Sequence, residues 1–163
     1  MKKTALILIV TVGAALVAWL LWRPTDEKKI VANLDKLAAY CSSPQKQTPM
    51  EIIASAASIA RLCNDPTMVT IHSLNINRPL ASKEISDHVL MLKRRLPPAG
   101  CSFRDSRVDV TGPTSAEVIT TLFLEGRQQG SKFTDAYEMD ISLEKNQGKW
   151  LFSSFRIVEF VQK

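Results

Sequence analysis

The chain has 163 residues, 45% of them hydrophobic, and a formal net charge of +5. Lys2 and Lys3 carry two of these charges, so residues 23–163 hold 19 basic residues (21 minus 2) against 16 acidic ones. Proteins that bind nucleic acid usually concentrate positive charge, and this nearly balanced segment does not have such an excess. We therefore expect one domain of ordinary size, with a core of its own and without a nucleic-acid partner.

Residues 4–22 form an uncharged run of 19 residues that ends at Arg23. As a helix this run would be about 28 Å long at about 1.5 Å per residue, close to the thickness of a bilayer's hydrocarbon core. Trp19, Trp22 and Arg23 are typical of the membrane–water interface, whereas the apolar part of a cleaved signal would end earlier. We predict an uncleaved transmembrane anchor over residues 4–22 that contacts the lipid bilayer. A signal cleaved after Ala18 is the alternative.

The flanks of this span predict the compartment. Residues 1–3 form a tail too short to need translocation, and the MKK start is similar to that of bacterial export signals. We therefore expect residues 1–3 in the cytoplasm and residues 23–163 in the periplasm, in a single-pass protein of the bacterial inner membrane. A domain that faces the cytosol is the alternative, because basic residues lie on both sides of the span.

The chain has three cysteines, Cys41, Cys63 and Cys101. In an oxidising compartment two of the three are expected to form a disulfide, and the sequence does not choose the pair. Three buried, reduced thiols are the alternative. No CxxC motif occurs, and His72 and His88 lie far from the cysteines in sequence, so we expect neither a metal site nor a cofactor.

Three helices are predicted in the first part of the domain. Thr25 caps the first, whose apolar residues from Ile30 to Cys41 form one stripe. The second runs from Pro49 to about Leu62, where the sequence TPME supplies a capping box with proline at the first helical position. The third runs over 82–96 and ends before two prolines.

Strands are predicted around these helices and in the second half of the domain. A short β-branched run predicts a strand over 68–72. Four longer strands are expected near 101–111, 115–126, 132–144 and 149–161. In the third of these, apolar and polar residues alternate, which is typical of a half-buried antiparallel strand. Its apolar face carries Phe133, Asp135, Tyr137, Met139, Ile141 and Leu143.

Helices followed by a meander of long strands predict an α+β fold, in which three helices pack on a curved, mainly antiparallel sheet. At IARLCNDPTMVTIH and LEKNQGKWLFSSFRI the chain resembles the NTF2-like superfamily, which includes ketosteroid isomerase and the SnoaL-like cyclases. The resemblance covers roughly residues 26–161 and implies a cone-shaped domain over residues 23–163, behind the predicted anchor. It also implies that residues inside the cone line a pocket, and Tyr40, His72, Tyr137 and Met139 are the candidates.

Catalysis has little support in the sequence. The resemblance implies a carboxylate base on the strand after the second helix, where this chain has Thr70, Ile71 and His72. It also implies an oxyanion aspartate near Asp140, which the alternation assigns to the polar face. We therefore expect no catalytic residue, and the alternative is an isomerase-like or hydrolase-like enzyme that uses His72 as a base.

The last strand predicts a protein interface. By strict alternation, Trp150, Phe152 and Phe160 lie on one face and Leu151, Phe155, Ile157 and Val161 on the other. Two apolar faces imply that the outer one is covered, and Phe152, Phe155 and Ile157 are the interface candidates. We thus predict a membrane-anchored, non-catalytic module for protein interaction or assembly, as a homodimer or with a membrane protein. The second hypothesis is a protein that binds a small apolar ligand.

Overall fold

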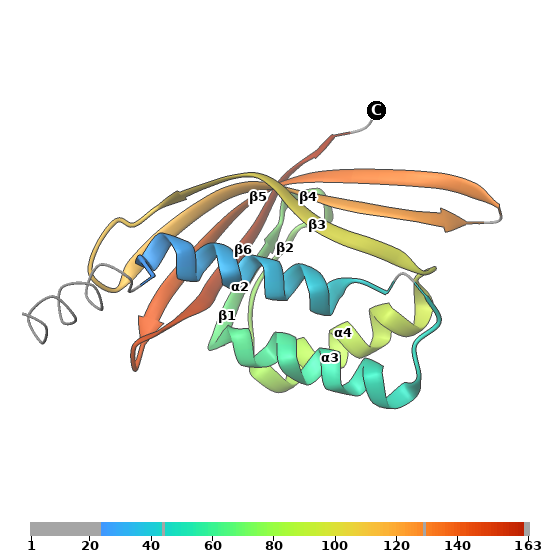
Figure 1. The fold of residues 1–163 in the computed structure, drawn as a ribbon, viewed down its shortest axis with the longest axis horizontal. Helices are drawn as coiled ribbons and strands as arrows, with labels where there is room; N and C mark the ends of the chain where they lie inside the picture. The colour runs from blue at the N-terminus through green and yellow to red at the C-terminus, as the bar shows by residue number, and fades with distance from the viewer. Residues whose placement is uncertain (1–23, 44, 129, 162–163) are drawn as a thin grey trace, which may run out of the picture.

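The computed structural model describes residues 24–43, 45–128 and 130–161. Its helices are α2 (Asp26–Cys41), α3 (Pro49–Leu62) and α4 (Ser82–Arg95), with a short 3-10 helix η1 (His72–Leu74). Its strands are β1 (Cys63–Ile71), β2 (Ile76–Leu80), β3 (Ala99–Asp109), β4 (Ser115–Gln128), β5 (Ser131–Asn146) and β6 (Lys149–Val161). The predicted α+β architecture is confirmed (Figure 1).

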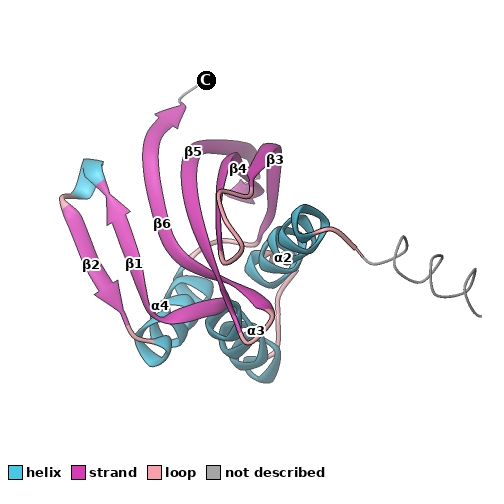
Figure 2. Cartoon of the chain, turned by 90° about the vertical axis from the view of Figure 1, so that its left-hand side faces the viewer, coloured by secondary structure: helices cyan, strands magenta, loops and turns pink. Residues whose placement is uncertain are grey.

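The six strands form one mixed sheet in the order β2-β1-β6-β5-β4-β3. All neighbouring pairs are antiparallel except β1 and β6, which run parallel. The sheet curves around the side on which the three helices lie (Figure 2). Helix α2 packs along β3 and against α3, and α3 packs against α4.

The starts of α2 and α3 follow from their N-terminal caps. At α3 the Glu51 N–H donates to the Thr48 hydroxyl at 3.3 Å, and the Thr48 N–H donates to the Glu51 carboxylate at 2.7 Å. The Thr25 hydroxyl accepts a hydrogen bond from the Lys28 N–H at the start of α2. Both caps satisfy backbone donors that the first helical turn leaves without partners. The predicted capping box is confirmed.

The core lies between the inner face of the sheet and the helices. It contains side chains of the three helices and of β1, β2, β4, β5 and β6, and the largest fully buried ones are Phe152, Ile30, Leu34, Ile141, Leu143, Val118 and Thr67. The buried residues of β5 are those of its predicted apolar face from Met139 to Leu143, together with Ala136. The alternation predicted for this strand is confirmed.

Two features of the sheet differ from the prediction. Strand β1 begins at Cys63, five residues before the predicted start, and its register with β6 shifts between Cys63 and Met68. Strand β2 was not predicted, because its sequence INRPL contains polar residues and Pro79. It lies at the edge of the sheet, where a proline without an N–H donor costs no interior hydrogen bond.

The predicted membrane anchor at residues 4–22 lies outside the described residues. Within residues 24–43, 45–128 and 130–161, no helix has both the length and the apolar character needed to cross a bilayer.

Candidate functional site

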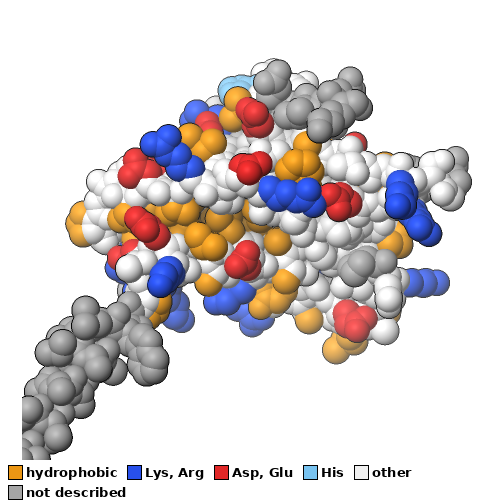
Figure 3. Space-filling view, turned by 45° about the horizontal axis from the view of Figure 1, so that its top comes forward, with side chains coloured by type: hydrophobic (Ala, Val, Ile, Leu, Met, Phe, Trp, Pro, Cys, Tyr) orange, Lys and Arg blue, Asp and Glu red, His pale blue; other side chains and the backbone are white. Residues whose placement is uncertain are grey.

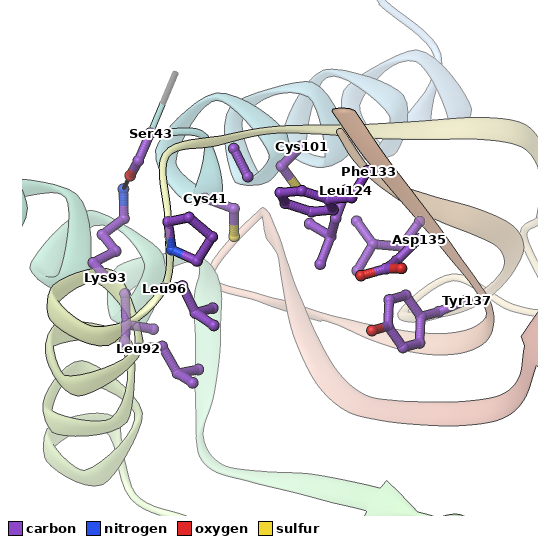
Figure 4. A pocket seen from close by; sticks show the side chains of 14 residues that line it. Cys41, Ser43, Leu92, Lys93, Leu96, Cys101, Leu124, Phe133, Asp135 and Tyr137 are labelled. Atoms are coloured by element: carbon purple, nitrogen blue, oxygen red, sulfur yellow. Dashed lines mark hydrogen bonds between the residues drawn. The ribbon is translucent and has the colours of Figure 1, made fainter. Parts of the chain in front are cut away.

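A cavity of about 540 Å³ lies between α4 and the inner face of strands β3, β4 and β5 (Figure 4). Most of its wall is apolar, and polar groups lie at a few positions only. The lining residues are Cys41, Ser43, Val89, Leu92, Lys93, Leu96, Pro97, Ala99, Cys101, Leu122, Leu124, Phe133, Asp135 and Tyr137. Such a volume and composition are typical of pockets that hold small organic molecules.

The strand wall of the cavity follows from strand pairing. Leu122 of β4 lies opposite Tyr137 of β5, and Leu124 lies opposite Asp135. Directly opposite residues of an antiparallel pair point to the same side of the sheet. The inward rows of β4 and β5 therefore stand side by side and form one continuous wall, with Phe133 at its end.

The Phe133 ring can lie in this wall because residue 126 of β4 is a glycine. A Cβ atom at Gly126 would lie 2.6 Å from the Pro98 carbonyl oxygen and 2.7 Å from two ring carbons of Phe133. These distances are too short for any side chain at this position. The missing side chain lets the Phe133 ring and the Pro98 carbonyl group approach β4 closely.

Gly126→Ala is expected to displace the Phe133 ring and to lower the free energy of unfolding by about 1–3 kcal/mol, the usual cost of overpacking. Denaturant unfolding measures the loss. Gly100→Ala is the matched control, because a Cβ atom there would meet only the Glu125 carbonyl oxygen at 3.7 Å, an ordinary contact. Equal losses in both variants would show that close contact at Gly126 is not the cause.

Lys93 of α4 lies at one end of the cavity, and its ammonium group is fully engaged. Its Nζ donates to the Ser42 carbonyl oxygen at 3.2 Å, the Ser43 hydroxyl at 3.0 Å and the Gln47 side-chain oxygen at 3.2 Å. These three acceptors use the three donors of an ammonium group. Partial burial lowers the pKa of Lys93 from its usual value. Lys93 therefore holds the α2–α3 connection and offers no unoccupied donor to a ligand.

Asp135 and Tyr137 form the polar part of the β5 wall, and Figure 4 shows them next to each other. Burial and the nearby negative charge of Asp135 raise the pKa of Tyr137, so its phenol stays neutral at neutral pH. Asp135 is half-buried and makes no hydrogen bond or ion pair with any residue that the structure describes. Its carboxylate is thus a hydrogen-bond acceptor that a bound molecule can use.

Two of the three cysteines also lie in the cavity wall. Cys41 ends α2 and Cys101 lies on β3, and both line the cavity. All three cysteines are reduced in this structure. Cys63 is buried at the start of β1 and does not line the cavity.

The residues predicted to line a pocket lie in different places. Tyr137 lines the cavity. Met139, two residues further along β5, is buried in the core, and Tyr40 packs against that core beside Cys41. His72 is exposed in η1, at the turn between β1 and β2, and does not line the cavity. Among the described residues, no group of three or more histidine, cysteine or acidic side chains could hold a metal ion.

The interface candidates all point to the inner side of the sheet, because β6 does not alternate strictly. Its register with β5 shifts at Ser153 and again at Val158, so each of these residues is an extra one. After each extra residue, the side chains that follow point to the face opposite to the one that regular alternation predicts. The three candidates therefore lie opposite residues of the buried face of β5: Phe152 opposite Leu143, Phe155 opposite Ile141 and Ile157 opposite Met139.

The face assignment made by strict alternation is therefore wrong for β6. Phe152 is fully buried, and Phe155 and Ile157 pack against the core. The surface in Figure 3 carries acidic and basic side chains interspersed, with a band of hydrophobic side chains between them. The argument for an apolar outer face on β6 does not hold for these three residues.

Sequence reasoning placed Asp135 on the same face as Tyr137, but it named neither Asp135 nor Lys93 as a site residue. The alternation of β5 was sufficient to find Asp135, since a carboxylate on an otherwise apolar face is unusual. The position of Lys93 in the sequence is not unusual in this way. A cation in the last turn of a helix is common, because it offsets the helix dipole.

No family model matches the sequence, and no curated protein matches it. Similar solved structures include an NTF2-like protein with a cystatin-like fold from Novosphingobium aromaticivorans, at 12% identity and a TM-score of 0.62, covering 90% of this chain and 86% of that one. A protein of unknown function with a cystatin-like fold from Nostoc punctiforme has 9% identity and a TM-score of 0.63, covering 83% and 91%.

A further similar structure, from Novosphingobium aromaticivorans, is provisionally named a scytalone dehydratase. It is 11% identical with a TM-score of 0.63, over 84% of this chain and 85% of that one. Identities this low show a shared fold and no shared activity. The similarity confirms that the chain has the NTF2-like fold expected from its sequence.

Proposed function

We propose that this protein binds a small, largely apolar molecule in the cavity between α4 and strands β3 to β5. The observation that carries the proposal is the cavity itself, with a volume of about 540 Å³ and a wall of leucine, valine, proline and phenylalanine side chains. Burial of apolar surface in such a space supplies binding free energy, and a few polar groups set the orientation of the ligand.

The polar groups of the wall favour a ligand with a hydrogen-bond donor. The Lys93 ammonium already donates to three neutral acceptors, so it has no donor left for a direct hydrogen bond to a ligand. The Asp135 carboxylate lies in the wall beside Tyr137 and accepts hydrogen bonds. A neutral apolar body with one hydroxyl or amine group fits this arrangement better than a carboxylate, which Asp135 would repel.

The alternative of an enzyme that uses His72 lacks this kind of support, because His72 is exposed in η1 and does not line the cavity. The proposal therefore includes no catalytic residue.

Binding to a second copy or to a membrane protein stays a prediction from the sequence. The anchor at residues 4–22 is also retained as a proposal, since its length and flanking residues support it, and it would keep the cavity close to a membrane.

The test is calorimetric titration with 2-naphthol, an apolar aromatic molecule with one hydroxyl donor. Leu92→Asp is expected to weaken binding at least tenfold, or about 1.4 kcal/mol, because it places a charge in the apolar wall. Leu92 is already 48% exposed, so the substitution should leave the fold intact.

Met91→Asp is the matched control, since Met91 is 42% exposed on the same helix and does not line the cavity. It should bind 2-naphthol as the wild type does. 2-Naphthoate, which replaces the donor with a negative charge, should bind the wild type more weakly than 2-naphthol. Failure of 2-naphthol to bind, or equal weakening in both variants, would contradict the proposed site.

A further inference from the structure

The junction between α2 and β3 holds Cys41 and Cys101 in fixed positions. The Cys101 N–H donates to the Ser42 hydroxyl at 2.9 Å, and that hydroxyl lies 2.8 Å from the Ala38 carbonyl oxygen and 3.2 Å from that of Cys101. One residue further on, the Ser43 N–H donates to the Ala99 carbonyl oxygen at 2.7 Å. The end of α2 is therefore tied to the start of β3 at the point where both cysteines enter the cavity wall.

The two thiols interact, and their environments differ. The neighbouring Cys101 thiol lowers the pKa of Cys41 despite burial, and the Lys93 charge acts in the same direction. The Cys41 thiol and burial raise the pKa of Cys101. Because the thiolate is the nucleophilic form, Cys41 is the better attacking group of the two.

Cys63 does not share this chemistry. It is buried at the start of β1 and lies outside the cavity wall. Burial raises the pKa of Cys63 to about 12, so its thiol stays protonated. The structure thus separates a pair of neighbouring thiols in the cavity wall from a third, inert one.

We propose that Cys41 and Cys101 form a dithiol site that thiol–disulfide exchange converts into a disulfide across the cavity wall. The oxidant is a disulfide, R–S–S–R, of a small thiol or of an exchange protein. The Cys41 thiolate attacks one sulfur, the R–S–S–R bond breaks, and one R–S⁻ leaves as Cys41 becomes a mixed disulfide. Cys101 then loses its proton and attacks the Cys41 sulfur, which releases the second R–S⁻. Both leaving thiolates take up a proton, so one disulfide is reduced for each one formed.

The new bond would close a loop that joins the end of α2 to β3. It would also replace two thiols in the wall with one rigid cross-link, so oxidation changes the shape of the cavity. This inference does not rest on the proposed ligand, because thiol counting does not require a bound molecule.

The full chain, purified in the reduced state, is incubated with oxidised glutathione and analysed by intact mass and peptide mapping. The wild type is expected to lose two hydrogen atoms, and mapping should join the Cys41 peptide to the Cys101 peptide. Cys63→Ser should behave in the same way. Cys101→Ser should retain a glutathione adduct on Cys41, because no second thiol resolves it.

A link that includes Cys63, a wild type that keeps all three thiols, or a stable adduct on wild-type Cys41 would each overturn the proposal. Peptide mapping of the wild type identifies the pair without any substitution, so a variant that fails to fold does not prevent the test. A positive thiol result without 2-naphthol binding would retain the redox site and reject only the ligand proposal.

Discussion

Phe152→Ala is expected to lower the free energy of unfolding by about 3–5 kcal/mol, as is usual for a fully buried phenylalanine. Phe152 is 0% exposed, lies opposite Leu143 in the sheet, and packs against Phe155 with ring centroids 5.3 Å apart. Truncation leaves a cavity that the surrounding strands cannot close completely. Because domains are stable by only about 5–15 kcal/mol, the variant should be close to its limit of stability. Denaturant unfolding followed by circular dichroism measures the change.

Phe123→Ala is the matched control on the opposite face of the same sheet. Phe123 is half-buried on β4 and lies opposite Ala136, and the Arg104 guanidinium stacks 4.5 Å from its ring centroid. Its loss should cost about 1–2 kcal/mol, from partial burial and one cation–π contact. Similar losses in the two variants would contradict the position of Phe152 in the core.

Sequence reasoning succeeded for the helices and for β5, where the signals are local or the strand is regular. Local signals predicted the three helices, since caps such as that between Thr48 and Glu51 are formed by residues close in sequence. The alternation in β5 predicted which of its residues face the core, because that strand is regular over the residues concerned. The resemblance to NTF2-like proteins predicted that the helices pack on a curved sheet.

The errors arose where the backbone departs from regular geometry. The extra residues Ser153 and Val158 reverse the faces of β6, and neither has a sequence signal that distinguishes a bulge from a regular strand. Strand β2 was missed for a different reason. Its polar sequence suits an exposed edge, and only its pairing with β1 makes it a strand.

The site was harder to predict than the fold, because it depends on contacts between distant segments. Periodicity predicted that Tyr137 points inward, but it cannot show that α4 brings Leu92 and Lys93 to the same space. That Cys41 and Cys101, but not Cys63, line the same cavity likewise depends on how α2 meets β3. His72 was considered for its chemistry, and its position at the end of a hairpin was visible only in the structure.

Deletion of residues 4–22 is expected to move the protein completely from the membrane fraction to the soluble fraction. The deleted run is uncharged and long enough for a helix of about 28 Å, and its removal takes away the apolar surface that would hold the chain in a bilayer. The full chain, in contrast, should stay with bacterial membranes during alkaline carbonate extraction and be released by detergent. Fractionation followed by immunoblotting measures both.

Intact mass of the membrane-bound full chain separates an anchor from a cleaved signal. A mass that includes residues 1–22 is expected, because the apolar run continues through Trp19 and Trp22, beyond the point where a signal is cut. A mass that begins after Ala18, or a full chain found in the soluble fraction, would reject the anchor. In either case the cavity would belong to a diffusing protein, and its ligand would have to be sought in solution rather than near a membrane.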